Sequence, residues 1–183
     1  MTGAQASVFK VDASGMETIL YLFTGDSDGQ FPMAGLIRDA EGNLYSTTNT
    51  GGAYGYGTVF KLDPNGAETV LHSFSTSDGG NPVAGVIRDE AGNLYGTTYQ
   101  GGLVYKLDPS GNETILHYFL GPDGSGPWSG VIRDQAGNLY GTTVEGGAYG
   151  YGVVYKITPL VQESYFREHL SQNPREAYVH RSD

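Results

Sequence analysis

The chain has 183 residues, no cysteine, and twenty Asp and Glu against ten Lys and Arg, which gives a formal net charge of −10. The lack of cysteine excludes disulfides and thiolate-bound metals, and the acidic balance, with basic residues spread one per repeat, argues against a nucleic-acid partner. No apolar stretch of about 18 residues occurs and no basic-then-apolar leader follows Met1, so we expect neither a membrane span nor a signal peptide.

A segment of 45 to 50 residues recurs along the chain. Its clearest mark is a Gly-Asn-Leu-Tyr motif that ends at Tyr45, Tyr95 and Tyr140. Around it lie short β-branched and aromatic runs bounded by Gly, Asn, Asp and Pro, a pattern typical of strands between turns. In chain order we predict two strands within 7–23, four-stranded units near 35–75 and 85–120, and three strands within 130–158.

The strands carry apolar residues on both faces. Alternation along one strand places Val70, His72 and Phe74 on one side and Leu71 on the other. A sheet that is apolar on both sides needs cover on both sides, and radially stacked blades supply it. We therefore predict an all-β fold, a β-propeller-like array of four-stranded antiparallel blades.

Thirteen predicted strands make about three blades, fewer than the four to eight that usually close a propeller ring. The chain is therefore either a piece of a longer protein or part of a homodimer that closes six blades by self-association through its terminal blades. We expect this repeat domain over residues 1–159.

Residues 160–183 break the repeat. The spacing of Leu160, Tyr165 and Leu170 approximates that of a helix, and Pro174 would end or kink it. We expect a helical or disordered tail over 160–183, either capping the last blade or foreign to the fold.

The motif Gly-[Leu/Val]-Ile-x-Asp-x-x-Gly-Asn-Leu-Tyr, with the Val-[Phe/Tyr]-Lys and Glu-Thr-[Ile/Val]-Leu segments, resembles the GloVer-type bacterial tandem-repeat (choice-of-anchor) family over about residues 4–158. That resemblance implies an extracellular or cell-surface setting for the parent protein and carries no established activity. The motif is also distantly similar to NHL repeats and to gluconolactonase-type propellers. This second similarity implies that the Val86-Ile87 segment is the inner strand of its blade and that Ile115 lies on the outer one.

Two sets of loops should emerge on one rim of the array: those after the outer strands and those between the second and third strands. Aromatic rings on such loops, beside Asp and Asn, suit a glycan or another small polar molecule. The candidate ligand-binding residues are Tyr54, Tyr56, Tyr149, Tyr151, Trp128 and Asn81. The alternative is that the tyrosines pack between blades. The middle repeat lacks five residues of this loop and keeps Gln100-Gly101-Gly102.

Acidic residues on the same rim are candidate ligands for Ca²⁺, which prefers hard oxygen donors. They are Asp26, Asp28, Asp78 and Asp123. Ile37 stands where an EF-hand loop would place its Glu, so the alternative is a solvated turn. We expect no nucleotide or redox cofactor, because the glycines of residues 51–57 lack the spacing and the following helix of a phosphate loop.

Other recurring polar residues favour structural roles. His72 and His117 share a repeat position with Tyr21, which favours a half-polar packing site over a catalytic base. Asp39, Asp89 and Asp134 recur beside turn glycines, so turn formation is expected, with a ring of carboxylates around a cation as the alternative.

The leading function prediction is an extracellular-type propeller module that binds a glycan or small polar ligand through the loop rim. An enzyme is the main alternative: the gluconolactonase-like motif implies a Ca²⁺-dependent hydrolase of lactones or esters, in which the cation polarises the carbonyl and activates water. A third possibility is a propeller fragment without activity.

Overall fold

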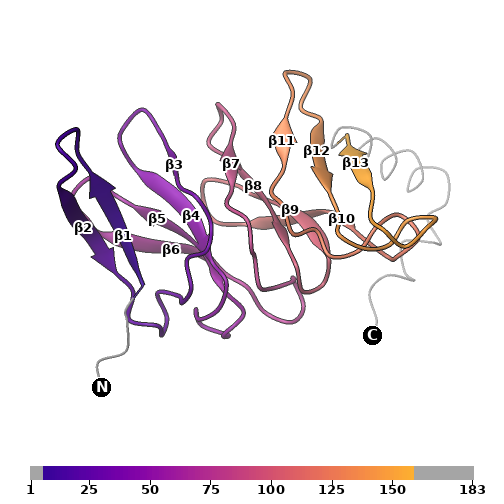
Figure 1. Ribbon diagram of the computed structural model, residues 1–183, viewed down its shortest axis with the longest axis horizontal. Helices are drawn as coiled ribbons and strands as arrows, with labels where there is room; N and C mark the ends of the chain where they lie inside the picture. The colour runs from indigo at the N-terminus through magenta and orange to yellow at the C-terminus, as the bar shows by residue number, and fades with distance from the viewer. Residues whose placement is uncertain (1–5, 159–183) are drawn as a thin grey trace.

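Four antiparallel sheets follow one another along the chain in the computed structural model, which describes residues 6–158 (Figure 1). The first sheet pairs β1 (Ser7–Val11) with β2 (Glu17–Leu22). The second contains β3 (Ile37–Arg38), β4 (Leu44–Thr48), β5 (Thr58–Leu62) and β6 (Glu68–Ser73). The third contains β7 (Ile87–Arg88), β8 (Leu94–Thr98), β9 (Leu103–Leu107) and β10 (Glu113–Tyr118). The fourth contains β11 (Ile132–Arg133), β12 (Leu139–Thr142) and β13 (Val154–Ile157).

The predicted all-β architecture of four-stranded antiparallel sheets is confirmed. Within each complete sheet the strands pair in chain order, β3-β4-β5-β6 and β7-β8-β9-β10. Among residues 6–158 no helix has the length and apolarity needed to cross a bilayer. The predicted tail, 160–183, lies outside the described residues.

Each pair of neighbouring sheets encloses its own apolar core. We call these contacts the first seam (first and second sheets), the second seam (second and third) and the third seam (third and fourth). Their buried residues form separate clusters, represented by Val8 with Phe60, Val59 with Tyr105, and Val104 with Tyr155. In the two complete sheets, the valine of the Val-[Phe/Tyr]-Lys segment therefore faces the following sheet, and the aromatic ring faces the preceding one. Cover on both sides of a sheet, as predicted, is supplied by its neighbours.

Within residues 6–158, no further sheet covers the outermost faces of the array. Val154 is 83% exposed, whereas its counterparts Val59 and Val104 are fully buried. Phe9 is likewise exposed on the first sheet. Each seam packs a valine of one sheet with an aromatic ring of the next, and the two outermost faces expose one of these partners each, Val154 and Phe9. Self-association through these faces stays a prediction.

The face assignment along β6 was wrong. The pairing of β5 with β6 shifts register between Val59 and Phe60, so Leu71 forms a β-bulge. The extra residue interrupts the two-residue alternation, and both Leu71 and Phe74 pack in the core of the second seam. Strand β10 has the same shift, between Ile115 and His117.

The recurring aspartates build the hairpin turns, as predicted. Asp39 accepts hydrogen bonds from the backbone N–H of Asn43 (2.8 Å), the Asn43 side chain (2.9 Å) and the Tyr45 hydroxyl (2.9 Å). Burial would raise the pKa of Asp39, but these hydrogen bonds lower it to about 2. Arg88 of the third sheet lies over the Tyr45 ring, with its guanidinium carbon 5.8 Å from the ring centre. Arg88 therefore helps to join the third sheet to the second.

Candidate functional site

Both predicted sets of loops lie on one edge of the array and are hydrogen-bonded to each other. In each repeat a loop after an outer strand pairs with the loop between the second and third strands of the next sheet. The pairs are Gln30 with Thr50, Gly80 with Gln100, and Ser125 with Glu145. The loop rim is therefore a continuous surface, crossed by the seams.

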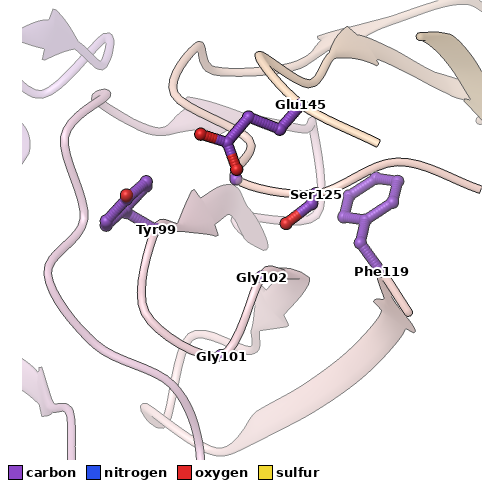
Figure 2. Close-up of a pocket in the computed structure, with 7 residues that line it drawn as sticks. Tyr99, Gly101, Gly102, Phe119, Ser125 and Glu145 are labelled. Carbon is purple, nitrogen blue, oxygen red and sulfur yellow. The ribbon is translucent and has the colours of Figure 1, made fainter. Parts of the chain in front are cut away.

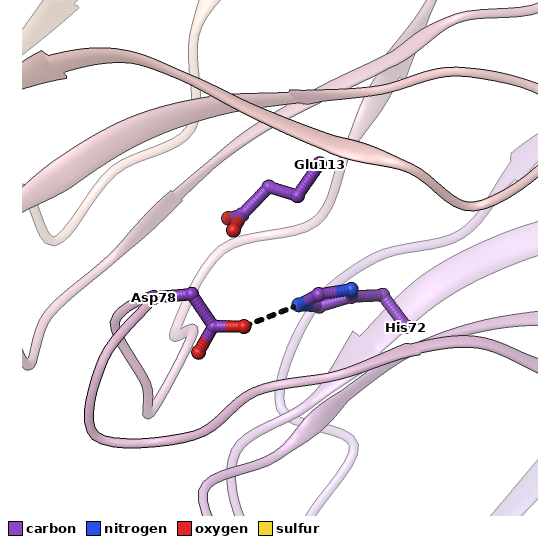
Figure 3. Close-up of side chains that lie close together, drawn as sticks. All are labelled: His72, Asp78 and Glu113. Atoms are coloured by element: carbon purple, nitrogen blue, oxygen red, sulfur yellow. Dashed lines mark hydrogen bonds and ion pairs between the residues drawn. The ribbon is translucent and has the colours of Figure 1, made fainter. Parts of the chain in front are cut away.

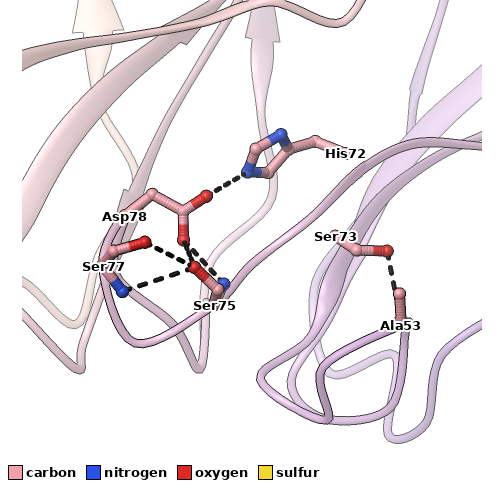
Figure 4. Close-up of polar contacts among 6 residues, drawn as sticks. All are labelled: Ala53, His72, Ser73, Ser75, Ser77 and Asp78. Atoms are coloured by element: carbon pink, nitrogen blue, oxygen red, sulfur yellow. Dashed lines mark hydrogen bonds and ion pairs between the residues drawn. The ribbon is translucent and has the colours of Figure 1, made fainter.

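At the second seam the long loop between β4 and β5 fills this surface. The Ala53 N–H donates to the Ser73 hydroxyl of β6 (3.3 Å), which fixes the loop over its own sheet (Figure 4). The Tyr56 carbonyl accepts a hydrogen bond from the Asn81 N–H (2.8 Å). The Tyr56 ring packs against the core that contains Val59 and Phe74.

At the third seam the corresponding loop is short and leaves a pocket. The long loop has nine residues, 49–57, between the paired strand residues Thr48 and Thr58. The short loop has only residues 99–102 between the equivalent pair, Thr98 and Leu103. No residue of the described part of the chain takes the place of Tyr56, and a pocket of about 290 Å³ opens there (Figure 2). It is lined by Tyr99, Gly101, Gly102, Phe119, Ser125, Gly126 and Glu145.

Polar groups and aromatic rings meet in this pocket. Two backbone hydrogen bonds between Ser125 and Glu145 (2.8 and 3.1 Å) hold these residues side by side. Figure 2 shows the Glu145 carboxylate and the Ser125 hydroxyl directed into the space between Tyr99 and Phe119. The ring of Trp128 lies 5.6 Å from that of Tyr99, tilted by 36°. The pocket thus combines an acceptor carboxylate, a hydroxyl and stacking surface.

Gly126 also lines the pocket, and the hydrogen bonding of its backbone N–H differs from that of its counterpart in the second seam. Gly126 occupies the repeat position of Asn81 and shares its positive φ, 59° against 49°. The Asn81 N–H donates to the Tyr56 carbonyl, but the short loop has no residue equivalent to Tyr56. Within residues 6–158, no hydrogen bond from the Gly126 N–H is formed.

The tyrosines predicted as ligand-binding residues have different surroundings. Tyr56 packs between sheets, whereas Tyr151, its counterpart in the fourth sheet, is 91% exposed because no fifth sheet follows within the described residues. Tyr54 and Tyr149 extend into solvent from the loop tips. Trp128 lies beside the pocket, and Asn81 belongs to the filled second seam.

The prediction from sequence missed Tyr99, Phe119, Ser125 and Glu145 as pocket residues. The sequence did contain one signal, the five-residue deletion in the middle repeat, which removes the position that Tyr56 and Tyr151 occupy in the other two repeats. Without the packing of Tyr56, that deletion could not be interpreted as an opening.

The predicted metal ligands lie at successive seams and not in one cluster. Three of the carboxylates pair with the last residue but one of an outer strand: Asp28 with Tyr21 (3.0 Å), Asp78 with His72 (3.1 Å) and Asp123 with His117 (2.8 Å). Asp26 contributes its backbone carbonyl, which accepts hydrogen bonds from Gly29 and Gly52. A Ca²⁺ site on these residues stays a prediction.

Stacked four-stranded sheets with a loop rim define a repeat protein of the propeller type. The chain belongs to the Gloeobacter/Verrucomicrobia repeat family, whose model matches residues 1–103, more than half of the chain. Among curated proteins none matches it.

A solved structure of a gluconolactonase from Xanthomonas campestris is similar in fold, with a TM-score of 0.52 and 18% sequence identity. The match covers 84% of this chain but only 56% of the gluconolactonase. The chain thus spans little more than half the length of that enzyme, and the likeness concerns the fold.

Proposed function

We propose that this protein is a propeller-type binding module that holds a glycan or another small polar ligand in the third-seam pocket. The observation that carries the proposal is the pocket itself, which exists where the loop lacks its interblade tyrosine and which is lined by Glu145, Ser125 and Tyr99. Its volume of about 290 Å³ suits a ligand of one sugar ring.

The pocket chemistry matches the two kinds of surface that a sugar presents. The apolar face of a sugar ring packs on aromatic side chains, here Tyr99 with Trp128 beside it. Its hydroxyl groups donate to the Glu145 carboxylate and exchange hydrogen bonds with Ser125, while the Gly126 N–H offers a further donor. The family resemblance supports an extracellular or cell-surface setting, where glycans are abundant.

Glycan-array screening followed by calorimetry with the tightest-binding glycan tests the proposal. Tyr99→Ala and Glu145→Gln should each weaken binding at least tenfold. Insertion of Gly-Ala-Tyr-Gly-Tyr between Gly101 and Gly102 restores the long loop and should abolish binding by filling the pocket. Tyr54→Ala and Tyr149→Ala are the matched controls. Loss of binding in these controls alone would move the site to the exposed loop tips.

A lactone hydrolase is a second candidate, favoured by the likeness in fold to the gluconolactonase. In that function a bound Ca²⁺ would polarise the lactone carbonyl and activate water. Hydrolysis of lactones and aryl esters should then disappear with EDTA and return with Ca²⁺. Absence of hydrolysis in the presence of Ca²⁺ would leave the binding module as the function.

A further inference from the structure

A second cluster of functional groups lies at the second seam, apart from the pocket. It contains His72 of β6, Asp78 of the following loop, and Glu113, the first residue of β10 in the next sheet. One imidazole nitrogen and two carboxylate oxygens come within 4.8 Å of one another (Figure 3). The cluster therefore bridges two sheets.

Two of the three side chains are held in place by their surroundings. One oxygen of Asp78 accepts hydrogen bonds from the backbone N–H of Ser75 (2.6 Å) and from its hydroxyl (2.8 Å), and the other lies 3.1 Å from Nε2 of His72 (Figure 4). The His72 ring packs edge-on against Phe74, with ring centres 4.8 Å apart. The geometry of this pair does not depend on a bound ligand.

The third side chain has an unsatisfied acceptor. Oε1 of Glu113 is buried and has no hydrogen-bond partner. Figure 3 shows the carboxylate directed toward Asp78 and His72. Burial, with the charge of Asp78 adding to it, raises the pKa of Glu113 to about 7. A buried carboxylate beside another carboxylate is costly without a cation between them.

We propose that His72, Asp78 and Glu113 form a Zn²⁺ site that links the second sheet to the third. One imidazole and two carboxylates suit Zn²⁺, whereas Ca²⁺ takes oxygen ligands. The 3.1 Å between His72 and Asp78 is close to the separation of about 3.4 Å between two ligands of a tetrahedral zinc ion. When the ion binds between Nε2 of His72 and Asp78, a neutral imidazole carries its proton on Nδ1, and an imidazolium releases its Nε2 proton to water. Rotation of the Glu113 side chain completes the three-ligand set.

The other seams supply natural controls. The first seam has the same two carboxylates, Asp28 and Glu68, but Tyr21 stands in place of the histidine. The third seam has His117 and Asp123, but no equivalent of Glu113 occurs there within residues 6–158. Only the second seam, in the described part of the chain, brings all three ligands together.

Calorimetric titration with ZnCl₂ at pH 7.5 tests the site. All variants carry His169→Ala and His180→Ala, so that the only imidazoles left are those of His72 and His117. We expect one Zn²⁺ per chain, at least tenfold weaker binding in His72→Tyr and in Glu113→Gln, and unchanged binding in His117→Ala. Tyr is the matched replacement because Tyr21 makes the equivalent hydrogen bond to Asp28, so the fold accommodates it.

A gain of function completes the test. Tyr21→His creates the three-ligand set at the first seam and should raise the stoichiometry to two Zn²⁺ per chain. Absence of Zn²⁺ binding in the parent protein, equally tight binding in His72→Tyr, or a stoichiometry that stays at one in Tyr21→His would each overturn the proposal. Because the pocket lies at the third seam, glycan binding reports independently on the proposed function.

Discussion

The second and third seams are built from the same repeat and end differently at the loop rim. In the second seam Tyr56 closes the rim and Phe74 is fully buried; in the third seam the tyrosine is missing and Phe119 lines a pocket. Below the rim both seams have the same valine-to-aromatic packing, Val59 on Tyr105 and Val104 on Tyr155. A five-residue change in one loop therefore converts a packing contact into a candidate binding site without altering the sheets.

The largest expected difference between the two seams is in the cost of removing their phenylalanines. Phe74→Ala should lower the free energy of unfolding by about 4 kcal/mol, because its ring is fully buried and contacts Tyr105 with ring centres 5.1 Å apart. Phe119→Ala should cost about 2 kcal/mol, because water can enter the space from the adjoining pocket. Urea unfolding of both variants checks this, and equal losses would contradict the difference in packing.

Shortening the long loop should transfer the open rim to the second seam. Deletion of residues 52–56 joins Gly51 to Gly57 and removes the Tyr56 ring, at a cost of about 2 kcal/mol in the free energy of unfolding. The new opening would have Gln100 where the pocket has Glu145 and Val83 where it has Trp128, so we expect no second bound glycan. Urea unfolding and calorimetric stoichiometry measure the two effects. A second site of equal affinity would show that the shape of the opening, and not Glu145 and Trp128, determines binding.

Much of this comparison follows from sequence. The repeat period and the recurring strands are local or periodic properties, and apolar residues on both faces required stacked sheets. The order of inner and outer strands, and with it the rim shared by two loop sets, came from the resemblance to gluconolactonase-type propellers. The β-bulge at Leu71 could not be predicted, because register depends on pairing with β5 and not on the β6 sequence. The pocket residues come from three different loops that only the stacking of two sheets brings together. The approach of Glu113 to His72 and Asp78 is equally invisible in sequence, since it joins two different sheets.

The pH dependence of the free energy of unfolding is a smaller effect, and it should distinguish the first two seams from the third. Burial, with the charge of a neighbouring aspartate adding to it, raises the pKa of both Glu68 and Glu113 to about 7 from an ordinary value of 4.5. Between these pH values the native state retains protons that the unfolded chain releases. The contribution of the two protonated glutamates to the free energy of unfolding is therefore complete below about pH 4.5 and is lost as pH rises through 7.

Glu113→Gln should therefore be more stable than the parent at pH 8, by about 1 kcal/mol after allowance for solvent screening, and the difference should shrink toward pH 4. Urea unfolding at pH 4, 6 and 8 in EDTA measures it, with Glu68→Gln as the matched variant. A difference that does not change with pH would rule out titration of the glutamate as its cause.

The smallest effect concerns the residue before the rim proline, which has a positive φ at all three seams. Phe31 (56°) stands where the other repeats have Asn81 (49°) and Gly126 (59°). This left-handed conformation is accessible to Asn and Gly but strained for a bulky side chain. Phe31→Asn should therefore raise the free energy of unfolding by about 0.5 to 1 kcal/mol, and Asn81→Phe should lower it by at least as much. Urea unfolding checks both variants. If Phe31→Asn is instead destabilising, contacts of the Phe31 ring outweigh the backbone strain, and the first seam then differs from the other two in how its rim is held.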